Sequence, residues 1–163
     1  MKNNALFLCN IRSALNVGAI ARSAAAFNVK TIFVGPETPY PTITNDARLP
    51  HIQKSTTRKI AKTALGALDH VTFVPVADIV DSLHALSDDY TVLGLEQDPR
   101  SIPLTSYRHN TSKPWLLVLG REVTGLNDQE LSACQHIIEI PHSKNKESLN
   151  VSVAAGIALF NLQ

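Results

Sequence analysis

The chain has 163 residues, of which 44% are hydrophobic and 18% charged, and its formal net charge is +1. This length suits one domain with a sizeable core, and the composition excludes an intrinsically disordered protein. The near-neutral charge excludes a surface that is basic all over, so any polyanionic partner must be bound by a local patch.

The cysteines and apolar runs indicate the cellular compartment of the protein, and the histidines bear on metal binding. Cys9 and Cys134 lie far apart without a CxxC pair, which argues against a disulfide framework or zinc site and favours a reducing compartment. The six histidines lack metal-ligand spacing, so we expect no metal. The N-terminal apolar stretch is too short for a signal peptide, and no run reaches the ~18 residues of a membrane span. We therefore expect a cytoplasmic protein without membrane contact.

Short apolar segments alternate with helical patterns along the chain. Strands are predicted at 5–10, 30–35, 70–76, 90–96, 114–120 and 136–141. Helices are predicted at 16–27, 46–67 (broken), 78–87, 127–134 and from about 149. Most strands are continuously apolar, which is typical of strands covered on both faces. The pattern predicts an α/β fold, a mostly parallel sheet flanked by helices, in a single domain over residues 1–163.

Individual residues mark where these elements begin and end. Asn28 is expected to take the left-handed conformation that ends a helix, and Asp78 and Asn127 are expected N-caps. Asn16 and Ser148 are predicted to cap the first and last helices. The least regular stretch, residues 36–58 with four prolines, is a candidate for a mobile substrate loop.

The first chemical motif is Asn-Val-Gly-Ala-Ile-Ala-Arg at 16–22, at a strand-to-helix turn. Gly18 and Ala19 would let another backbone approach the first helical turn. Arg22 is either a solubilising charge or a clamp for a phosphate or carboxylate near the helix N-terminus. No GxGxxG follows a strand, so dinucleotide binding lacks its main support.

The second motif, Leu-Gly-Arg-Glu-Val-Thr-Gly-Leu at 119–126, directly follows a predicted strand. Gly120 and Gly125 frame an arginine and a glutamate where open α/β sheets bind ligands. From spacing alone, an ordinary turn with Arg121 and Glu122 in solvent is slightly favoured.

The third motif, IEIPHSKNKESLNVS at 138–152, runs from the last predicted strand to Ser148-Leu149-Asn150, which open the last and almost wholly apolar helix. Asparagine is a mediocre helix former, so Asn150 at the mouth of this helix suggests a ligand there. A separate group of cations, Lys54, Arg58, Lys59 and Lys62, is either a solvated helix face or a track for a phosphate backbone.

In this order the three motifs resemble the SpoU (TrmH-like) family of RNA 2′-O-ribose methyltransferases, in the SPOUT superfamily. The matching positions are Asn16, Gly18, Ala19, Arg22, Gly120, Glu122, Gly125, Leu126, Ile140, Pro141, Ser148, Leu149, Asn150, Val151 and Ser152. The resemblance covers essentially the whole chain. The sequence departs from the family at His142 and Lys144, where Met and Gly are common, and at Arg121, where Asn is frequent.

The resemblance implies a deep C-terminal trefoil knot, a homodimer and S-adenosylmethionine as methyl donor, with S-adenosylhomocysteine as product. The cofactor-binding residues that it implies are Leu95, Glu96, Leu119, Gly120, Gly125, Ile140, Pro141, Ser148 and Leu149. The catalytic residues that it implies are Asn16, Arg22, Glu122, Ser148 and Asn150. Because a neutral guanidinium is costly to reach, we expect Arg22 to clamp a phosphate instead of acting as the base.

The resemblance implies RNA as the partner, with tRNA the first choice of substrate and rRNA the alternative. The expected RNA-binding residues are Arg12, Arg22, Arg48, Lys54, Arg58, Arg121 and Lys144, with Arg108, Lys113 and Lys146 as further candidates. We expect no separate RNA-binding extension. A non-catalytic RNA-binding knot protein is an alternative that the intact motifs disfavour, and an unrelated nucleotide-dependent enzyme lacks its glycine motif.

Overall fold

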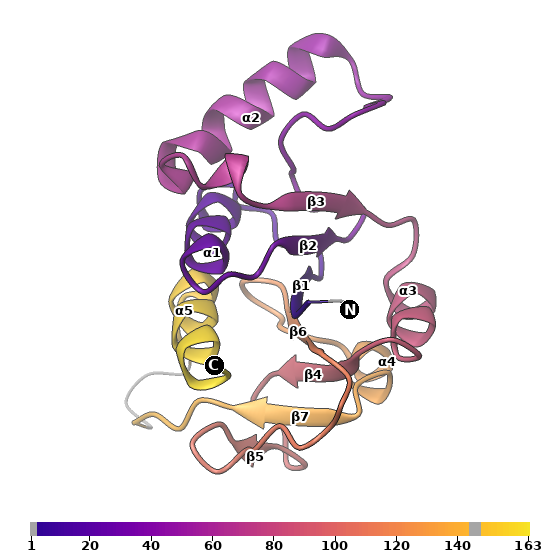
Figure 1. Ribbon diagram of the computed structural model, residues 1–163, viewed down its shortest axis with the longest axis vertical. Helices are drawn as coiled ribbons and strands as arrows, with labels where there is room; N and C mark the ends of the chain where they lie inside the picture. Colours follow the sequence, from indigo (N-terminus) through magenta and orange to yellow (C-terminus); the bar gives the residue numbers. More distant parts are fainter. Residues whose placement is uncertain (1–2, 144–147) are drawn as a thin grey trace.

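Figure 1 shows the computed structural model, which describes residues 3–143 and 148–163. The strands are β1 (Ala5–Leu8), β2 (Thr31–Val34), β3 (Thr72–Pro75), β4 (Thr91–Leu95), β5 (Ile102–Pro103), β6 (Trp115–Leu119) and β7 (His136–Glu139). The helices are α1 (Ala14–Ala26), α2 (Pro50–Ala64), α3 (Ile79–Leu86), α4 (Asp128–Ser132) and α5 (Val151–Asn161), with a short 3₁₀ helix at Ala67–Asp69. The expectations for Lys144 and Lys146 lie outside the described residues.

The seven strands form one sheet in the order β3-β2-β1-β6-β4-β7-β5, and every strand pair in it is parallel. Helices α1 and α5 cover one face, and α3 and α4 cover the other (Figure 1). The predicted α/β architecture with a parallel sheet is thereby confirmed. None of the helices in the described ranges is long and apolar enough to cross a membrane.

Strand β1 explains why the sheet has a core on each side. Successive strand residues point to opposite faces. Leu6 and Leu8 join the cluster that packs under α1 and α5, while Ala5 and Phe7 join the cluster under α3 and α4. A strand buried on both faces must be apolar at every position, which is how it reads in the sequence.

The strand order positions the site. Strand β6 lies between β1 and β4, and β7 lies beside β4. Because all these strands are parallel, the turns that follow β4, β6 and β7 meet at the same edge of the sheet. Residues distant in sequence, around 96, 120 and 140, are thereby brought together.

Two of the predicted helix caps are wrong, and both errors have a local cause. Helix α1 begins earlier than expected, at Ala14, because the Ser13 Oγ accepts a hydrogen bond from the Asn16 N–H at 3.3 Å and caps it. Helix α5 is capped by Asn150, whose Oδ1 accepts from the Ser152 N–H at 2.8 Å, and not by Ser148. These caps free Asn16 for tertiary contacts.

Other expected element ends are confirmed. Asn28 has a left-handed backbone, with φ of 57°, just beyond α1. Asp78 caps α3, and Asn127 caps α4 through a reciprocal capping box with Glu130. The two-residue strand β5, at the edge of the sheet, was not predicted, because so short a segment carries no periodicity.

The irregular stretch is shorter than predicted, because α2 is one unbroken helix from Pro50 to Ala64. Proline at its start fits, since the first helical N–H needs no partner. Ahead of it, Arg48 organises the chain. Its guanidinium pairs with the Asp46 carboxylate, donates to the Tyr40 carbonyl oxygen at 2.9 Å and lies 3.6 Å over the Tyr40 ring. The pairing with Arg48 lowers the pKa of Asp46 to about 2.

Helix α1 lies unusually close to α2 at Gly18. A Cβ added there would lie 2.2 Å from both the Ile60 carbonyl oxygen and the Thr63 Oγ1. We predict that Gly18→Ala destabilises the protein by about 1–3 kcal/mol, because the two helices would have to separate. Urea unfolding measures this. The matched control is Gly156→Ala in α5, where an added Cβ would lie 3.7 Å from the Ser23 Oγ, an ordinary contact distance. An equal loss in both variants would contradict the prediction.

Candidate functional site

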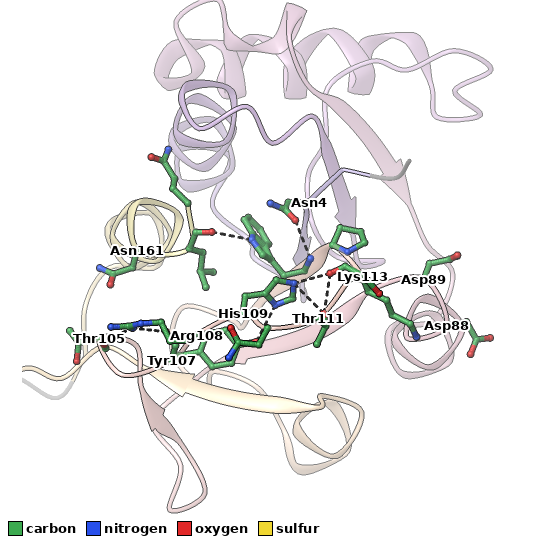
Figure 2. Close-up of a pocket in the computed structure, with 16 residues that line it drawn as sticks. Asn4, Asp88, Asp89, Thr105, Tyr107, Arg108, His109, Thr111, Lys113 and Asn161 are labelled. Atoms are coloured by element: carbon green, nitrogen blue, oxygen red, sulfur yellow. Dashed lines mark hydrogen bonds between the residues drawn. The ribbon is translucent and has the colours of Figure 1, made fainter.

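One hollow lies at the edge of the sheet where β6 begins, and Figure 2 shows its lining. It measures about 1150 Å³ and is open. Two of its cations bond to the protein itself: Lys113 Nζ donates to the Ser87 carbonyl oxygen at 3.0 Å, and Arg108 Nη1 donates to that of Thr105 at 2.9 Å. Trp115 Nε1 donates to the Leu162 carbonyl oxygen at 3.2 Å. None of the three motifs reaches this hollow, so we do not place the chemistry there.

A second pocket, of about 320 Å³, lies at the opposite edge, where β4, β6 and β7 end. Four segments contribute to it: the turns after these three strands and the start of α5. Its lining residues are Leu95, Glu96, Gln97, Leu119, Gly120, Arg121, Glu122, Val123, Thr124, Gly125, Glu139, Ile140, His142, Ser148, Leu149, Val151 and Ala154. The second and third motifs are therefore brought together here.

The turn after β6 is held in a narrow shape. The backbone of Arg121 bonds that of Gly125 in both directions, at 3.2 and 3.1 Å. Gly125 has φ of 64°, and a Cβ on it would lie 2.1 Å from the Glu96 Oε2. That same oxygen accepts a hydrogen bond from the Leu126 N–H at 2.8 Å. Glu96 therefore supports the turn from the neighbouring strand, which only glycine at 125 permits.

Glu122 joins this turn to the start of α1. Its Oε2 accepts from the Arg12 N–H at 3.1 Å, and its Oε1 accepts from the Ser13 N–H at 3.0 Å and the Asn16 Nδ2 at 3.1 Å. The first turn of α1 carries no acidic residue of its own, so Glu122 supplies the negative charge that a helix N-terminus favours.

The contacts of Glu122 also decide its protonation. Burial raises the pKa of this carboxyl, but the hydrogen bonds from Ser13, Arg12 and Asn16 outweigh it, so that the pKa lies below the ordinary value. Asn16 continues the chain of contacts, because its Oδ1 accepts from the Asn150 Nδ2 at 3.2 Å. One residue from each motif, Asn16, Glu122 and Asn150, therefore belongs to a single hydrogen-bonded network.

Arg121, which the sequence analysis places among the RNA-binding residues, is paired with a buried carboxylate. Its guanidinium makes two parallel hydrogen bonds of 2.9 Å to the carboxylate of Glu130, whose side chain is 1% exposed. These bonds raise the pKa of Arg121. Glu130 also accepts from the Asn127 N–H at 2.9 Å. The cation predicted to bind RNA thus anchors the turn to the start of α4.

The thiols lie close to this ion pair. Cys134 Sγ donates to the Glu130 carbonyl oxygen at 3.2 Å, and burial raises its pKa to about 12. Burial also raises the pKa of Cys9 well above the ordinary value. Both cysteines are free thiols. No group of three or more His, Cys, Asp or Glu residues within the described ranges could hold a metal ion.

The pocket collects most of the predicted cofactor residues but not all of the catalytic ones. Of the cofactor set, only Pro141 is absent from the lining, and it is exposed. Asn16, Arg22 and Asn150 do not line the pocket. The lining residues to which the sequence analysis assigned no role in the site are Gln97, Val123, Thr124, Glu139, Val151 and Ala154, although Val123, Thr124, Glu139 and Val151 lie within the motifs.

His142, noted before only as a departure from the family, has a clear structural place. Its Nδ1 lies 2.8 Å from the Ile140 carbonyl oxygen, and its Nε2 lies 3.2 Å from the Gln97 Nε2. It therefore connects two of the turns that line the pocket.

The predicted RNA-binding residues fall into two groups. Arg12 and Arg48 have acidic partners, since Arg12 pairs with Glu37 at 3.2 Å on the surface and Arg48 is held by Asp46. Lys54 and Arg58 are exposed on α2. Arg22 is exposed on α1 and lines a third hollow, between α1 and α2.

The model of the SpoU rRNA Methylase family matches residues 3–160. The chain belongs to this family. The match includes all three motifs, and the network of Asn16, Glu122 and Asn150 gives them a common physical role.

Named relatives agree with this assignment. The chain is 32% identical over 157 residues to the 23S rRNA (guanosine-2′-O-)-methyltransferase RlmB of Acinetobacter baylyi, covering 95% of this chain and 57% of that protein. The chain thus spans little more than half the length of this relative.

Solved structures share the fold. An AdoMet-bound rRNA methyltransferase from Sinorhizobium meliloti superposes with a TM-score of 0.78 at 21% identity, covering 98% of this chain and 55% of that one. The TrmH/SpoU tRNA modifying enzyme of A. aeolicus gives 0.76 at 22% identity, covering 99% and 74%. At these identities the likeness establishes a common fold.

The ion pair of Arg121 and Glu130 makes a testable prediction about stability. Arg121→Met leaves the Glu130 carboxylate buried without its cation and should cost roughly 2–4 kcal/mol in urea unfolding. The double variant Arg121→Met/Glu130→Gln should recover part of this loss, because the buried charge is gone. Asp98→Asn, which breaks the more exposed pair with Arg100, is the control and should cost less than ~1 kcal/mol. An Arg121→Met variant as stable as the control would contradict the prediction.

Proposed function

We propose that the chain is an S-adenosylmethionine-dependent RNA methyltransferase that methylates a ribose 2′-hydroxyl in tRNA or rRNA. The observation that carries this proposal is the pocket at the carboxyl ends of β4, β6 and β7, whose walls hold the second and third family motifs. Relatives named for rRNA and neighbours named for tRNA both support an RNA substrate, so the test includes both RNAs.

The pocket suits the proposed cofactor. Its volume of about 320 Å³ lies in the range of small-ligand sites, and Leu95, Leu119 and Ile140 provide apolar walls for a purine. The turn at Gly120 and the start of α5 bring backbone N–H and carbonyl groups to the same space. We assign adenine and ribose binding to these groups, with Ser148 and Leu149. When bound, S-adenosylmethionine supplies an electrophilic methyl group.

The network limits which residues can accept the proton of the ribose hydroxyl. Glu122 already accepts three hydrogen bonds from Arg12, Ser13 and Asn16, and its lowered pKa makes it a poor base. We therefore assign Glu122, Asn16 and Asn150 to positioning the pocket. Arg22 would clamp the phosphate next to the target ribose, and that phosphate or a water would take the proton. Ser148 would orient the hydroxyl.

A homodimer would bring Arg22 to the pocket. Within one chain Arg22 lines a different hollow, and Arg121, the arginine that lines the pocket, is occupied by Glu130. Helix α5 also exposes Val153, Ile157 and Phe160, at 52%, 36% and 67%. Their spacing of four and three residues places them on one helix face, which suits a contact with a second copy.

We further propose the deep trefoil knot of the SPOUT superfamily for the C-terminal segment. Family membership supports it, as does the meeting of the 120–126 turn with residues 148–150 beside α1. A cytoplasmic location is proposed because both cysteines are free thiols, which is typical of a reducing compartment.

A methyl-transfer assay tests the function. Protein and tritiated S-adenosylmethionine are incubated with tRNA, and separately with rRNA, from a strain that lacks the gene, followed by nuclease digestion and nucleoside analysis. We expect a labelled 2′-O-methylnucleoside from one of the two RNAs. Absence of label from both, together with no cofactor binding in calorimetry, would refute the proposal.

Arg22→Lys tests the clamp. Lysine keeps the charge but loses the two-pronged geometry for a phosphate, so we predict a fall in turnover of roughly 10²-fold with cofactor affinity unchanged. Arg100→Lys, on an exposed arginine outside the pocket lining, is the matched control and should retain activity. Turnover near that of the wild type in Arg22→Lys would argue against the clamp.

Complementation between subunits tests the shared site. Arg22→Ala should be inactive, and so should Gly125→Val, because a Cβ at 125 collides with Glu96. Co-expression of the two variants should restore part of the activity, since one pocket of the mixed dimer is intact and faces an intact Arg22. If every mixture stays inactive although size-exclusion chromatography shows mixed dimers, Arg22 does not act across the interface.

A further inference from the structure

The cations of the chain are unevenly distributed, and helix α2 holds the clearest excess. Its 15 residues, Pro50–Ala64, contain four of the 15 Lys and Arg residues and none of the 14 Asp and Glu residues. The whole chain has a net charge of only +1. A local patch of this kind is what a nearly neutral protein needs in order to bind a polyanion.

Three of these cations lie on one face of α2. Lys54, Arg58 and Lys62 are spaced by four residues, so they follow one another along the helix over roughly 12 Å. All three are exposed, while Ile60 and Ala64 bury the opposite face. Like charges at this spacing repel one another by a few tenths of a kcal/mol per pair. No ion pair to any of the three is found among the described residues.

Lys62, the last of these three cations, lies beside Arg22 of helix α1. A hollow of about 490 Å³ between α1 and α2 is lined by Arg22 and Lys62, with Ser23, Thr63 and Phe27, and by no acidic residue. The two helices are fixed to each other beside it, because Thr63 Oγ1 donates to the Leu15 carbonyl oxygen at 2.8 Å and Gly18 admits close contact. The contact between α1 and α2 therefore fixes the relative positions of the two helices that carry Arg22 and Lys62.

A purely structural explanation covers only part of this arrangement. A cation in the last turn of a helix interacts favourably with the helix dipole, and Lys62 lies in the last turn of α2. Lys54 and Arg58 lie in earlier turns, where the dipole gives no such benefit. Solubility alone would be served as well by alternating signs, which α2 lacks.

We propose that Lys54, Arg58 and Lys62 form a track for the phosphodiester backbone of the RNA substrate, and that this track ends in the α1–α2 hollow at Arg22. The inference rests on the proposed function and deepens it. The strand that carries the target ribose runs along α2, and Lys62 and Arg22 contact neighbouring phosphates at its end. Sequence selection lies elsewhere, because phosphate contacts carry no base information.

The test compares two triple variants with the same change in charge. The track variant is Lys54→Gln/Arg58→Gln/Lys62→Gln, and the control is Lys2→Gln/Lys30→Gln/Arg100→Gln, which removes three cations from outside α2 that are not among the candidate RNA-binding residues. Binding of tRNA and of 23S rRNA is measured across salt concentrations, with cofactor affinity and size-exclusion profiles for both variants. Each lost phosphate contact should reduce the slope of log K against log salt by about 0.7–0.9.

We expect the track variant to lose about two to three units of slope with unchanged cofactor affinity and oligomeric state, and the control to lose much less. Equal losses in the two variants, or wild-type behaviour of the track variant, would overturn the track while leaving the methyltransferase assignment intact. A changed oligomeric state in the track variant alone would instead assign this face to a subunit contact. If the wild-type protein bound neither RNA nor cofactor, the proposed function would fall, and the track with it.

Discussion

The site depends on one carboxylate. Glu122 follows β6, yet its oxygens accept hydrogen bonds from the backbone of Arg12 and Ser13 and from the side chain of Asn16, more than 100 residues away. The N-terminus of α1 offers unsatisfied N–H groups and a partial positive charge, and a charged acceptor from another part of the chain satisfies both. The orientation of α1 and the path of the 120–126 turn are thus fixed by the same contact.

An ion pair holds the same turn from a second direction. Arg121 and Glu122 are neighbours in sequence but bond in different directions, Arg121 to α4 and Glu122 to α1. The turn between Gly120 and Gly125 is therefore held from both sides, and Glu96 supports it from β4. A binding loop held in this way keeps its shape without a ligand, which lowers the entropic cost of binding.

Much of the fold could be predicted because its signals are local. Continuous apolar segments such as residues 5–8 are typical of strands buried on both faces, and Asp78 and Asn127 are capping residues directly before the helices α3 and α4. The caps of α1 and α5 were mistaken because Ser13 and Asn16, like Ser148 and Asn150, are both good capping residues at nearly the right place. Local sequence does not decide between them; the tertiary contacts of Asn16 do.

The roles of Arg48 and Arg121 could not be read from the sequence for a different reason. The sequence does not distinguish an arginine that binds a phosphate from one that pairs with a buried carboxylate. It also does not show that the Glu130 side chain is buried. The predicted cofactor residues, all but Pro141, line one pocket because the family motifs recorded contacts between distant parts of the chain. What the matching positions leave out, such as Gln97 and His142, lies on the same turns and follows once those turns are placed.

The long sequence separation between Glu122 and the start of α1 also affects how the protein folds during synthesis. During synthesis α1 emerges early, but the carboxylate that bonds to its N-terminus is absent until Glu122, 96 residues beyond the end of α1, has been added, and Asn150 arrives later still. Contacts across such long stretches form slowly, since a large loop must close before any of them contributes. A nascent chain should therefore carry a partly built sheet with an unfinished pocket, and ligand binding would mark the last stage of its folding.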